Sequence, residues 1–236
     1  MTHFLRHQPC PNCGSSDARG IWSDGSQYCF SCKSYQPPTS LDSFTLKRKK
    51  ATSSYIALPE DAIPYLPDFV KAWLNKYSLT DAEIKLINPL WSFSRSSLIF
   101  PVYANGVLLM YQERYFGEEK RPKYLTYGYK GDVMHLLGNH SESMVVITED
   151  LISAVKVSTV MNSMPVWGSN LSLKDATRLS KRFKHLVLWL DMNKASDSLK
   201  MASKYAPLFD SSVSVVTELD PKEYSHDEIR DRIRIL

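Results

Sequence analysis

The chain has 236 residues, of which 43% are hydrophobic and 23% are charged, which is an ordinary globular composition. No stretch approaches the roughly 20 apolar residues that a membrane span needs, and the N-terminus lacks the apolar core of a secretion signal. We therefore expect no membrane insertion and no secretion, and the net charge of +4 is too small to indicate a polyanion partner by itself.

The cysteines are concentrated at one end of the chain. All four lie in the first 32 residues, as two C-x2-C pairs separated by fifteen residues. Two disulfides would suit a secreted mini-domain, but this chain has no secretion signal and no cysteine elsewhere. Each C-x2-C pair can direct two sulfurs at one point, and zinc prefers a tetrahedral set of thiolates. The spacing predicts one closed, structural zinc site formed by Cys10, Cys13, Cys29 and Cys32.

The composition changes after the last cysteine. Residues 37–55 mix Pro, Ser and Thr with the basic run Lys47–Lys50, which predicts a flexible basic linker. Such a run is most often solvated surface, and beside a nucleic acid it can serve as a tether. Residues 56–92 show a helical pattern of apolar residues. In residues 96–116, apolar runs flank Asn105-Gly106, which predicts a β-hairpin with a two-residue turn.

The last hundred residues alternate short apolar runs with longer amphipathic segments. We predict strands at 144–148, 164–168, 185–191 and 213–219, and helices at 151–162, 172–183, 194–206 and 226–236. Strands that alternate with helices of this length indicate a parallel sheet covered on both faces, hence an α/β fold.

Acidic residues follow three of these predicted strands. They are Glu149, Asp191 and Asp220. Ligands of open α/β sheets bind beyond the carboxyl ends of the strands, and converging carboxylates suit magnesium. The alternative is that strands end in loops and that loops are polar, so the pattern alone leaves both interpretations open.

Several motifs together resemble a known family. PCPNCGSSD and WSDGSQYCFSC resemble the zinc ribbon of DnaG-type bacterial and phage DNA primases, most of all the primase half of the primase-helicases of short-tailed phages. ITEDLISAVKV, LVLWLDMNKAS and LDPKEY resemble a TOPRIM domain, and RPKYLT resembles the basic motif of the primase polymerase domain. The resemblance implies an N-terminal zinc ribbon that binds template (1–36), the linker (37–55), the N-terminal subdomain of an RNA polymerase domain (56–138) and a TOPRIM subdomain with a parallel sheet (139–236).

The resemblance also implies roles for individual residues. Glu149 would ligate metal or assist proton transfer from the attacking 3′-hydroxyl, and Lys123 and Arg114 would hold nucleotide phosphates. The implied ligands of catalytic Mg²⁺ (or Mn²⁺) are Glu149, Asp191, Asn193 and Asp220. The implied nucleic-acid-binding residues are Trp22, Asp24, Ser26, Tyr28, Lys120 and Arg121, and Phe30 and Tyr35 are further aromatic side chains suited to stacking on bases.

Some positions depart from the family pattern. Asp150 stands where the family has Gly, and Asn193 stands where it usually has Asp, so the site loses one charge at position 193. Our hypothesis is that Asp150 restores this charge, and Asp also tolerates a left-handed backbone. Ser153 replaces a common acid, and Ser26 takes the place of a base-reading histidine found in phage relatives.

The implied activity is that of a DNA primase, a nucleotidyltransferase that makes short RNA primers during DNA replication. Its expected partners are single-stranded DNA template, ribonucleoside triphosphates, a separate replicative helicase and a DNA polymerase, in the cytoplasm of a bacterial host if the protein is viral. The chain has no G-x4-G-K-[ST] phosphate loop, so we do not expect helicase activity.

The alternative is a non-catalytic single-stranded-DNA-binding protein, either an inactive primase or a mediator of the RecR type, although RecR places its zinc element directly before the TOPRIM fold. A topoisomerase would need DNA-gate domains for which 236 residues leave no room.

Overall fold

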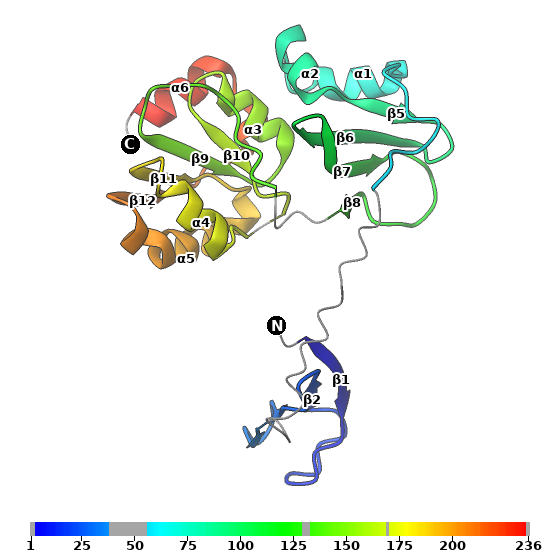
Figure 1. Ribbon diagram of the computed structural model, residues 1–236, viewed down its shortest axis with the longest axis vertical. Coiled ribbons are helices and arrows are strands. Elements are labelled where there is room, and N and C mark those ends of the chain that lie inside the picture. Colours follow the sequence, from blue (N-terminus) through cyan, green and yellow to red (C-terminus); the bar gives the residue numbers. More distant parts are fainter. Residues whose placement is uncertain (1–2, 38–55, 129–132, 169, 235–236) are drawn as a thin grey trace. The chain divides into compact units, whose positions relative to one another are not determined.

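The computed structural model describes residues 3–37, 56–128, 133–168 and 170–234 and divides the chain into two compact units, 1–55 and 56–236 (Figure 1). The basic run Lys47–Lys50 and most of the predicted linker lie outside the described residues. No helix in the described ranges is long and apolar enough to span a membrane.

The first unit is a small antiparallel sheet in which each strand pairs with the next along the chain. Its strands are β1 (Phe4–Gln8), β2 (Arg19–Trp22), β3 (Gln27–Cys29) and β4 (Tyr35–Gln36). Only Cys10, Cys29 and Gly20 are buried among its described residues, so this unit has almost no hydrophobic core. A domain of this kind depends on a metal or a cross-link for its stability.

The second unit begins with two helices and an antiparallel sheet of order β5-β6-β7-β8. The elements are α1 (Asp68–Asn75), α2 (Asp81–Ile87), β5 (Leu90–Ser92), β6 (Ser97–Ala104), β7 (Val107–Tyr115) and β8 (Tyr124–Gly128). The predicted hairpin is confirmed: β6 and β7 are joined by Asn105 and Gly106, with φ angles of 50° and 76°. Helix α2 begins with a capping box in which Thr80 and Glu83 each bond the other's backbone N–H.

A parallel sheet of order β10-β9-β11-β12 follows, and the predicted α/β class is confirmed. Its elements are β9 (Met144–Thr148), α3 (Leu151–Ser158), β10 (Ser163–Pro165), α4 (Leu173–Leu179), β11 (His185–Leu188), α5 (Ala195–Tyr205), β12 (Ser211–Ser214) and α6 (His226–Arg234). Strand β12 begins two residues earlier than predicted and ends before the apolar pair Val215-Val216, because its pairing with β11 extends only from Ser211 to Ser214.

Alternate residues of the central strands pack on opposite faces of this sheet. Val145 and Ile147 of β9 pack with α4 and α5, and Val146 packs with α3 and α6. Strand β11 repeats the pattern, since Leu186 and Leu188 lie on the first face and Val187 on the second. Both faces are therefore covered, and the strand ends are the open part of the sheet.

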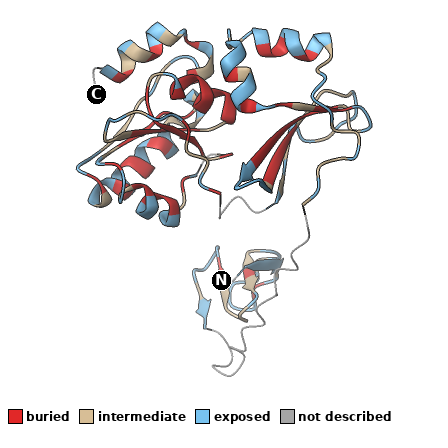
Figure 2. Ribbon diagram, turned by 45° about the horizontal axis from the view of Figure 1, so that its top comes forward, coloured by how far each residue is buried: buried red, intermediate tan, exposed pale blue. Residues whose placement is uncertain are grey.

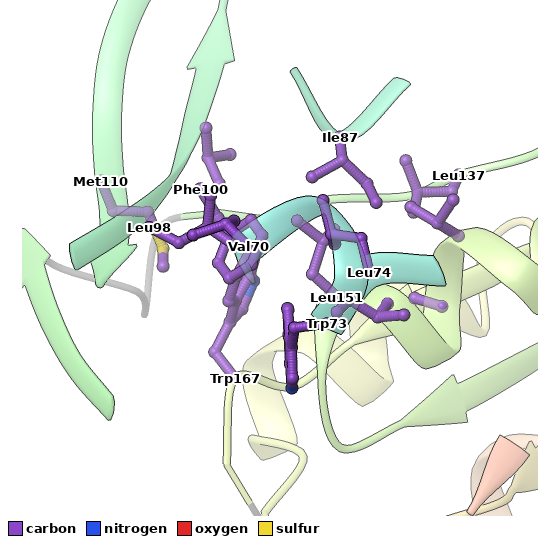
Figure 3. Close-up of a cluster of buried hydrophobic side chains, with 14 of the residues drawn as sticks. Val70, Trp73, Leu74, Ile87, Leu98, Phe100, Met110, Leu137, Leu151 and Trp167 are labelled. Carbon is purple, nitrogen blue, oxygen red and sulfur yellow. The ribbon is translucent and has the colours of Figure 1, made fainter. Parts of the chain in front are cut away.

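The antiparallel and parallel parts of the second unit share one hydrophobic core. Helix α3 is buried along its whole length, which Figure 2 shows as an uninterrupted buried segment. Its Leu151 packs with Trp73 and Leu74 of α1, and with Phe100 of β6 (Figure 3). The buried ammonium of Lys156 in α3 adds a polar link, because it donates to the carbonyl oxygen of Tyr77 at 2.5 Å. This core holds the two parts together as one body.

Candidate functional site: a cysteine cluster and an acidic sheet edge

The four cysteine sulfurs lie together, as the spacing predicts. All four are within 4.8 Å of one another. Sγ–Sγ distances are 3.8 Å for Cys10–Cys32 and 3.7 Å for Cys13–Cys29, far longer than the roughly 2.05 Å of a disulfide. A tetrahedral set of four thiolates at this separation fits zinc and leaves no open position for a catalytic water.

Two knuckles of the same geometry build this cluster. The N–H of Gly14 donates to the carbonyl of Cys10 at 2.9 Å, and that of Lys33 donates to the carbonyl of Cys29 at 2.9 Å. Both turn residues have a left-handed backbone, with φ angles of 70° for Gly14 and 60° for Lys33. The role of Lys33 was not apparent from the sequence, because a lysine rarely takes the position that favours glycine.

Aromatic side chains gather beside this cluster. Around a hollow of about 280 Å³ the structure places Trp22, Ser26, Tyr28, Phe30 and Tyr35. Phe30 and Tyr35 are 59% and 64% exposed, so the rings are open to a ligand. The hydroxyl and the backbone N–H of Ser26 donate to Asp24 at 2.6 and 2.9 Å. These two hydrogen bonds lower the pKa of Asp24. The ribbon residues predicted to bind nucleic acid therefore lie on one surface.

Four carboxylates come together at the carboxyl edge of the parallel sheet. Glu149 and Asp150 follow β9, Asp191 follows β11, and Asp220 precedes the 3₁₀ turn η5 (Pro221–Glu223). The Nζ atom of Lys222 lies 2.8 Å from Asp220, 2.9 Å from Asp150 and 3.8 Å from Asp191. We call these five residues, Glu149, Asp150, Asp191, Asp220 and Lys222, the acidic edge.

Two carboxylate oxygens of the acidic edge have no hydrogen-bond partner. They are Oε2 of Glu149 and Oδ1 of Asp191, and both atoms are buried. Burial raises the pKa of Asp191 to about 7, and the neighbouring carboxylates add to the effect while Lys222 opposes it. Burial also raises the pKa of Glu149. Unpartnered buried oxygens and a surplus of carboxylates over cations are the donor set that a divalent cation would satisfy.

All residues of the acidic edge except Asp220 line one wall of a cavity of about 270 Å³. Trp167 and Gly168, after β10, continue this wall. The opposite wall comes from the antiparallel sheet, where Gln112 of β7 donates to Thr126 of β8 at 3.2 Å. Tyr124 completes this second wall. Tyr124 and Thr126 belong to the quoted RPKYLT motif, but neither was predicted as a site residue, because that motif was interpreted through its basic side chains.

Two of the predicted basic residues, Arg114 and Arg121, lie over aromatic rings but have different polar partners. Arg114 is enclosed by rings, with its guanidinium 4.2 Å from the Trp73 ring centre, and it donates to the Tyr124 hydroxyl at 2.8 Å. Arg121 lies over the Tyr115 ring and pairs with the fully buried Glu113 at 3.5 Å. Arg114 thus supports the cavity wall through Tyr124.

Three further predicted residues are exposed and do not line the cavity. They are Lys120, Lys123 and Asn193. Asp150 has an extended backbone with φ of −121°, so the tolerance of Asp for a left-handed conformation is not used at this position. Its carboxylate caps α3 by accepting the N–H and the hydroxyl of Ser153, both at 3.0 Å. Lys222 was part of the quoted motif, but its central place among the acids was not foreseen.

The chain was compared with known proteins. No family model matches it. The zinc-binding and RNA polymerase domains of Aquifex aeolicus primase have a similar structure, with a TM-score of 0.54, 12% identity and coverage of 99% of this chain and 79% of that chain. The chain therefore has the fold of these primase domains, and the resemblance to primases is confirmed at the level of the fold.

Phage proteins give two further matches. The primase fragment of the bacteriophage T7 primase-helicase is 18% identical, with a TM-score of 0.49 and coverage of 99% of this chain and 98% of that one. A DNA helicase/primase of Enterobacteria phage T3 is 53% identical over 34 residues, which are 14% of this chain and 6% of that protein.

We predict that zinc is required for the fold of the first unit alone. Cys29→Ser should reduce zinc from one ion per chain to none, because three thiolates in so small a core bind the ion far more weakly. Metal analysis would measure this, and limited proteolysis should then remove residues 1–55 and leave 56–236 intact. Ser31→Ala, in the same knuckle, is the control. A proteolysis pattern that Cys29→Ser leaves unchanged would contradict the prediction.

A second prediction concerns the ring of His135, which stacks on Trp167 at 5.9 Å between ring centres. Burial lowers the pKa of His135 to about 4. The unfolded chain binds a proton below about pH 6.5, whereas the folded chain does not, so stability is lost as the pH falls from about 6.5 to 4. We expect a loss on the order of 2 kcal/mol.

Urea unfolding of wild type and His135→Gln at several pH values would measure this loss. The variant should show a flatter dependence of unfolding free energy on pH over this range, and His185→Gln should behave like wild type. Parallel pH profiles for wild type and His135→Gln would refute the assignment.

Proposed function

We propose that this chain is a DNA primase that makes RNA primers on single-stranded DNA by divalent-metal-dependent nucleotidyl transfer. The observation that carries the proposal is the pair of unpartnered buried oxygens, on Glu149 and Asp191, at the carboxyl edge of a parallel sheet. Ligand sites of open α/β sheets lie at this edge. The primase fold of the chain supports the same assignment.

The acidic edge would hold Mg²⁺ through Glu149 and Asp191. Bound there, the ion would offset charge on the reacting phosphates. The cavity of about 270 Å³ would admit the triphosphate end of a nucleotide beside Gln112, Tyr124 and Thr126. Arg114 would fix the Tyr124 hydroxyl that faces this cavity. Lys123 is exposed and directly precedes Tyr124 in the sequence, and it would contact the phosphates from outside the cavity.

The first unit would bind the template. Its zinc would hold the fold, and the rings of Trp22, Tyr28 and Phe30 would stack on unpaired bases. Ser26 and Asp24, joined by a hydrogen bond, would present polar atoms at the same surface. The partners would be single-stranded DNA, ribonucleoside triphosphates, a DNA polymerase and a replicative helicase, in the cytoplasm of a bacterial host.

A primer-synthesis assay tests this proposal directly. Wild type is incubated with random single-stranded template, ribonucleotides and Mg²⁺, and we expect short RNA products. Glu149→Gln should lower the rate by about 100-fold or more, since even outer-shell groups of metal sites cost 10- to 100-fold. Glu218→Gln, at an exposed position outside the cavity, is the matched control. Cys29→Ser should abolish the dependence of products on template sequence.

No product from wild type on any template, with DNA binding intact, would favour a non-catalytic binding protein over a primase. Full activity of Glu149→Gln would refute the placement of the reaction at the acidic edge.

The Asp150 hypothesis has its own test. Asp150→Asn keeps the cap on α3, because Asn and Asp cap helices about equally well, but it removes one charge from the acidic edge. We expect the Mg²⁺ concentration for half-maximal primer synthesis to rise about three- to tenfold. Asp197→Asn on α5 is the control for an acid outside the cavity. An unchanged Mg²⁺ requirement would show that Asp150 does not compensate for Asn193.

A further inference from the structure

The ammonium ion of Lys222 lies where carboxylates converge. Its Nζ is 2.8 Å from Oδ2 of Asp220, 2.9 Å from Oδ2 of Asp150 and 3.8 Å from Oδ2 of Asp191. The side chain is only 15% exposed, so solvent screens these pairs less than it screens pairs on the surface. One cation thus lies among three acids that come from three separate loops, and its single positive charge offsets only part of their negative charge.

The backbone holds Lys222 in this position. Its carbonyl oxygen accepts a hydrogen bond at 3.0 Å from the buried ammonium of Lys156, which belongs to α3. Asp220 begins the same turn, and its capping box with Glu223 fixes the backbone on either side of Lys222. A surface lysine can pair with an acid in one of many side-chain conformations. The ammonium of Lys222 has less conformational freedom, because its backbone is fixed and its side chain is largely buried.

With Lys222 lying among them, the carboxylates that it contacts are not gathered closely enough to hold a metal ion. In the described part of the chain, the cysteine cluster is the only group of three or more His, Cys, Asp or Glu side chains whose ligand atoms lie within 4.8 Å of one another. The unpartnered oxygens, Oε2 of Glu149 and Oδ1 of Asp191, are different atoms from those that Lys222 contacts. The acidic edge therefore has an ammonium on one side and free oxygens on the other.

We propose that Lys222 is a built-in counter-cation that occupies one cation position of the acidic edge. The ammonium is then the cation that pairs with Asp150 and Asp220 and cancels one of their two charges, and a divalent cation has only the side formed by Glu149 and Asp191. The inference deepens the proposed function, since it states how many ions that site takes. The protein would bind at most one divalent ion at this edge, where the same carboxylates without Lys222 would bind a second.

Direct metal binding tests this inference independently of primer synthesis. Zinc-loaded full-length protein is titrated with Mn²⁺, and free Mn²⁺ is measured by electron paramagnetic resonance. Lys222→Met should bind one more Mn²⁺ per chain than wild type, or bind the same number about tenfold or more tightly, because a like charge near the site is gone. Lys222→Arg keeps the charge and should behave like wild type.

The matched control is Lys200→Met on α5, which removes an exposed lysine that lies 3.9 Å from Asp197. It should leave Mn²⁺ binding unchanged. Thermal unfolding gives a second measurement, because Lys222→Met leaves three carboxylates without their cation. Its melting temperature should fall in metal-free buffer and recover with Mn²⁺, whereas NaCl of equal ionic strength should have little effect.

Equal Mn²⁺ number and affinity for wild type and a folded Lys222→Met would overturn the inference, as would a failure of either protein to bind Mn²⁺. If Lys222→Met does not fold in metal-free buffer, folding induced by Mn²⁺ supports the inference and the absence of such rescue overturns it. The absence of primer synthesis by wild type would refute the proposed function. The Mn²⁺-binding results would still decide whether Lys222 occupies a cation position.

Discussion

The coverage of both faces of the parallel sheet is the constraint on which the rest of the second unit depends. Strands β9 and β11 bury successive side chains on opposite faces, against α4 and α5 on one side and α3 and α6 on the other. No polar group can be placed within such strands without losing its hydrogen bonds to water. The polar chemistry of this sheet therefore lies at the strand ends, where Glu149, Asp191 and Asp220 follow or precede the regular elements.

A sheet edge alone would be an open surface, and the shared core turns it into a cavity. Helix α3 is buried on all sides because it packs on its own sheet and on α1 and β6 of the antiparallel part. That packing brings Tyr124 and Thr126 opposite Asp150 and Asp191. The buried ammonium of Lys156 reinforces the arrangement, since it binds the carbonyl oxygens of Tyr77 and Lys222 and so connects both parts to the loop that carries Asp220. Core packing and the geometry of the acidic edge are thus parts of one structure.

The sequence predicted those features that follow from short-range periodicity and spacing. The cysteine pairs, the Asn105-Gly106 hairpin and the acids after the apolar strands are local patterns. The structure places the cysteines, the hairpin and Glu149 as expected, whereas Asp220 lies six residues beyond the end of β12. Residues that act through distant contacts were missed or misplaced. Asn193 is exposed although it follows Asp191 by only two residues, because the turn at Met192–Lys194 directs the chain away from the cavity. Lys222 and Tyr124 lie in the quoted motifs LDPKEY and RPKYLT, but these motifs are about a hundred residues apart, and neither shows that both side chains line one cavity.

The two clusters of the chain illustrate why ligand type is easier to predict than charge balance. Four cysteine sulfurs have one satisfactory partner, a thiophilic ion, and no neighbouring side chain competes for that role. Carboxylates accept many cations, and the ammonium of Lys222 is one that the chain itself supplies. An ammonium neutralises charge and donates hydrogen bonds, but it cannot act as a Lewis acid. An acidic edge that holds Lys222 therefore has two parts. Asp150 and Asp220 pair with the ammonium, whereas Oε2 of Glu149 and Oδ1 of Asp191 have no hydrogen-bond partner.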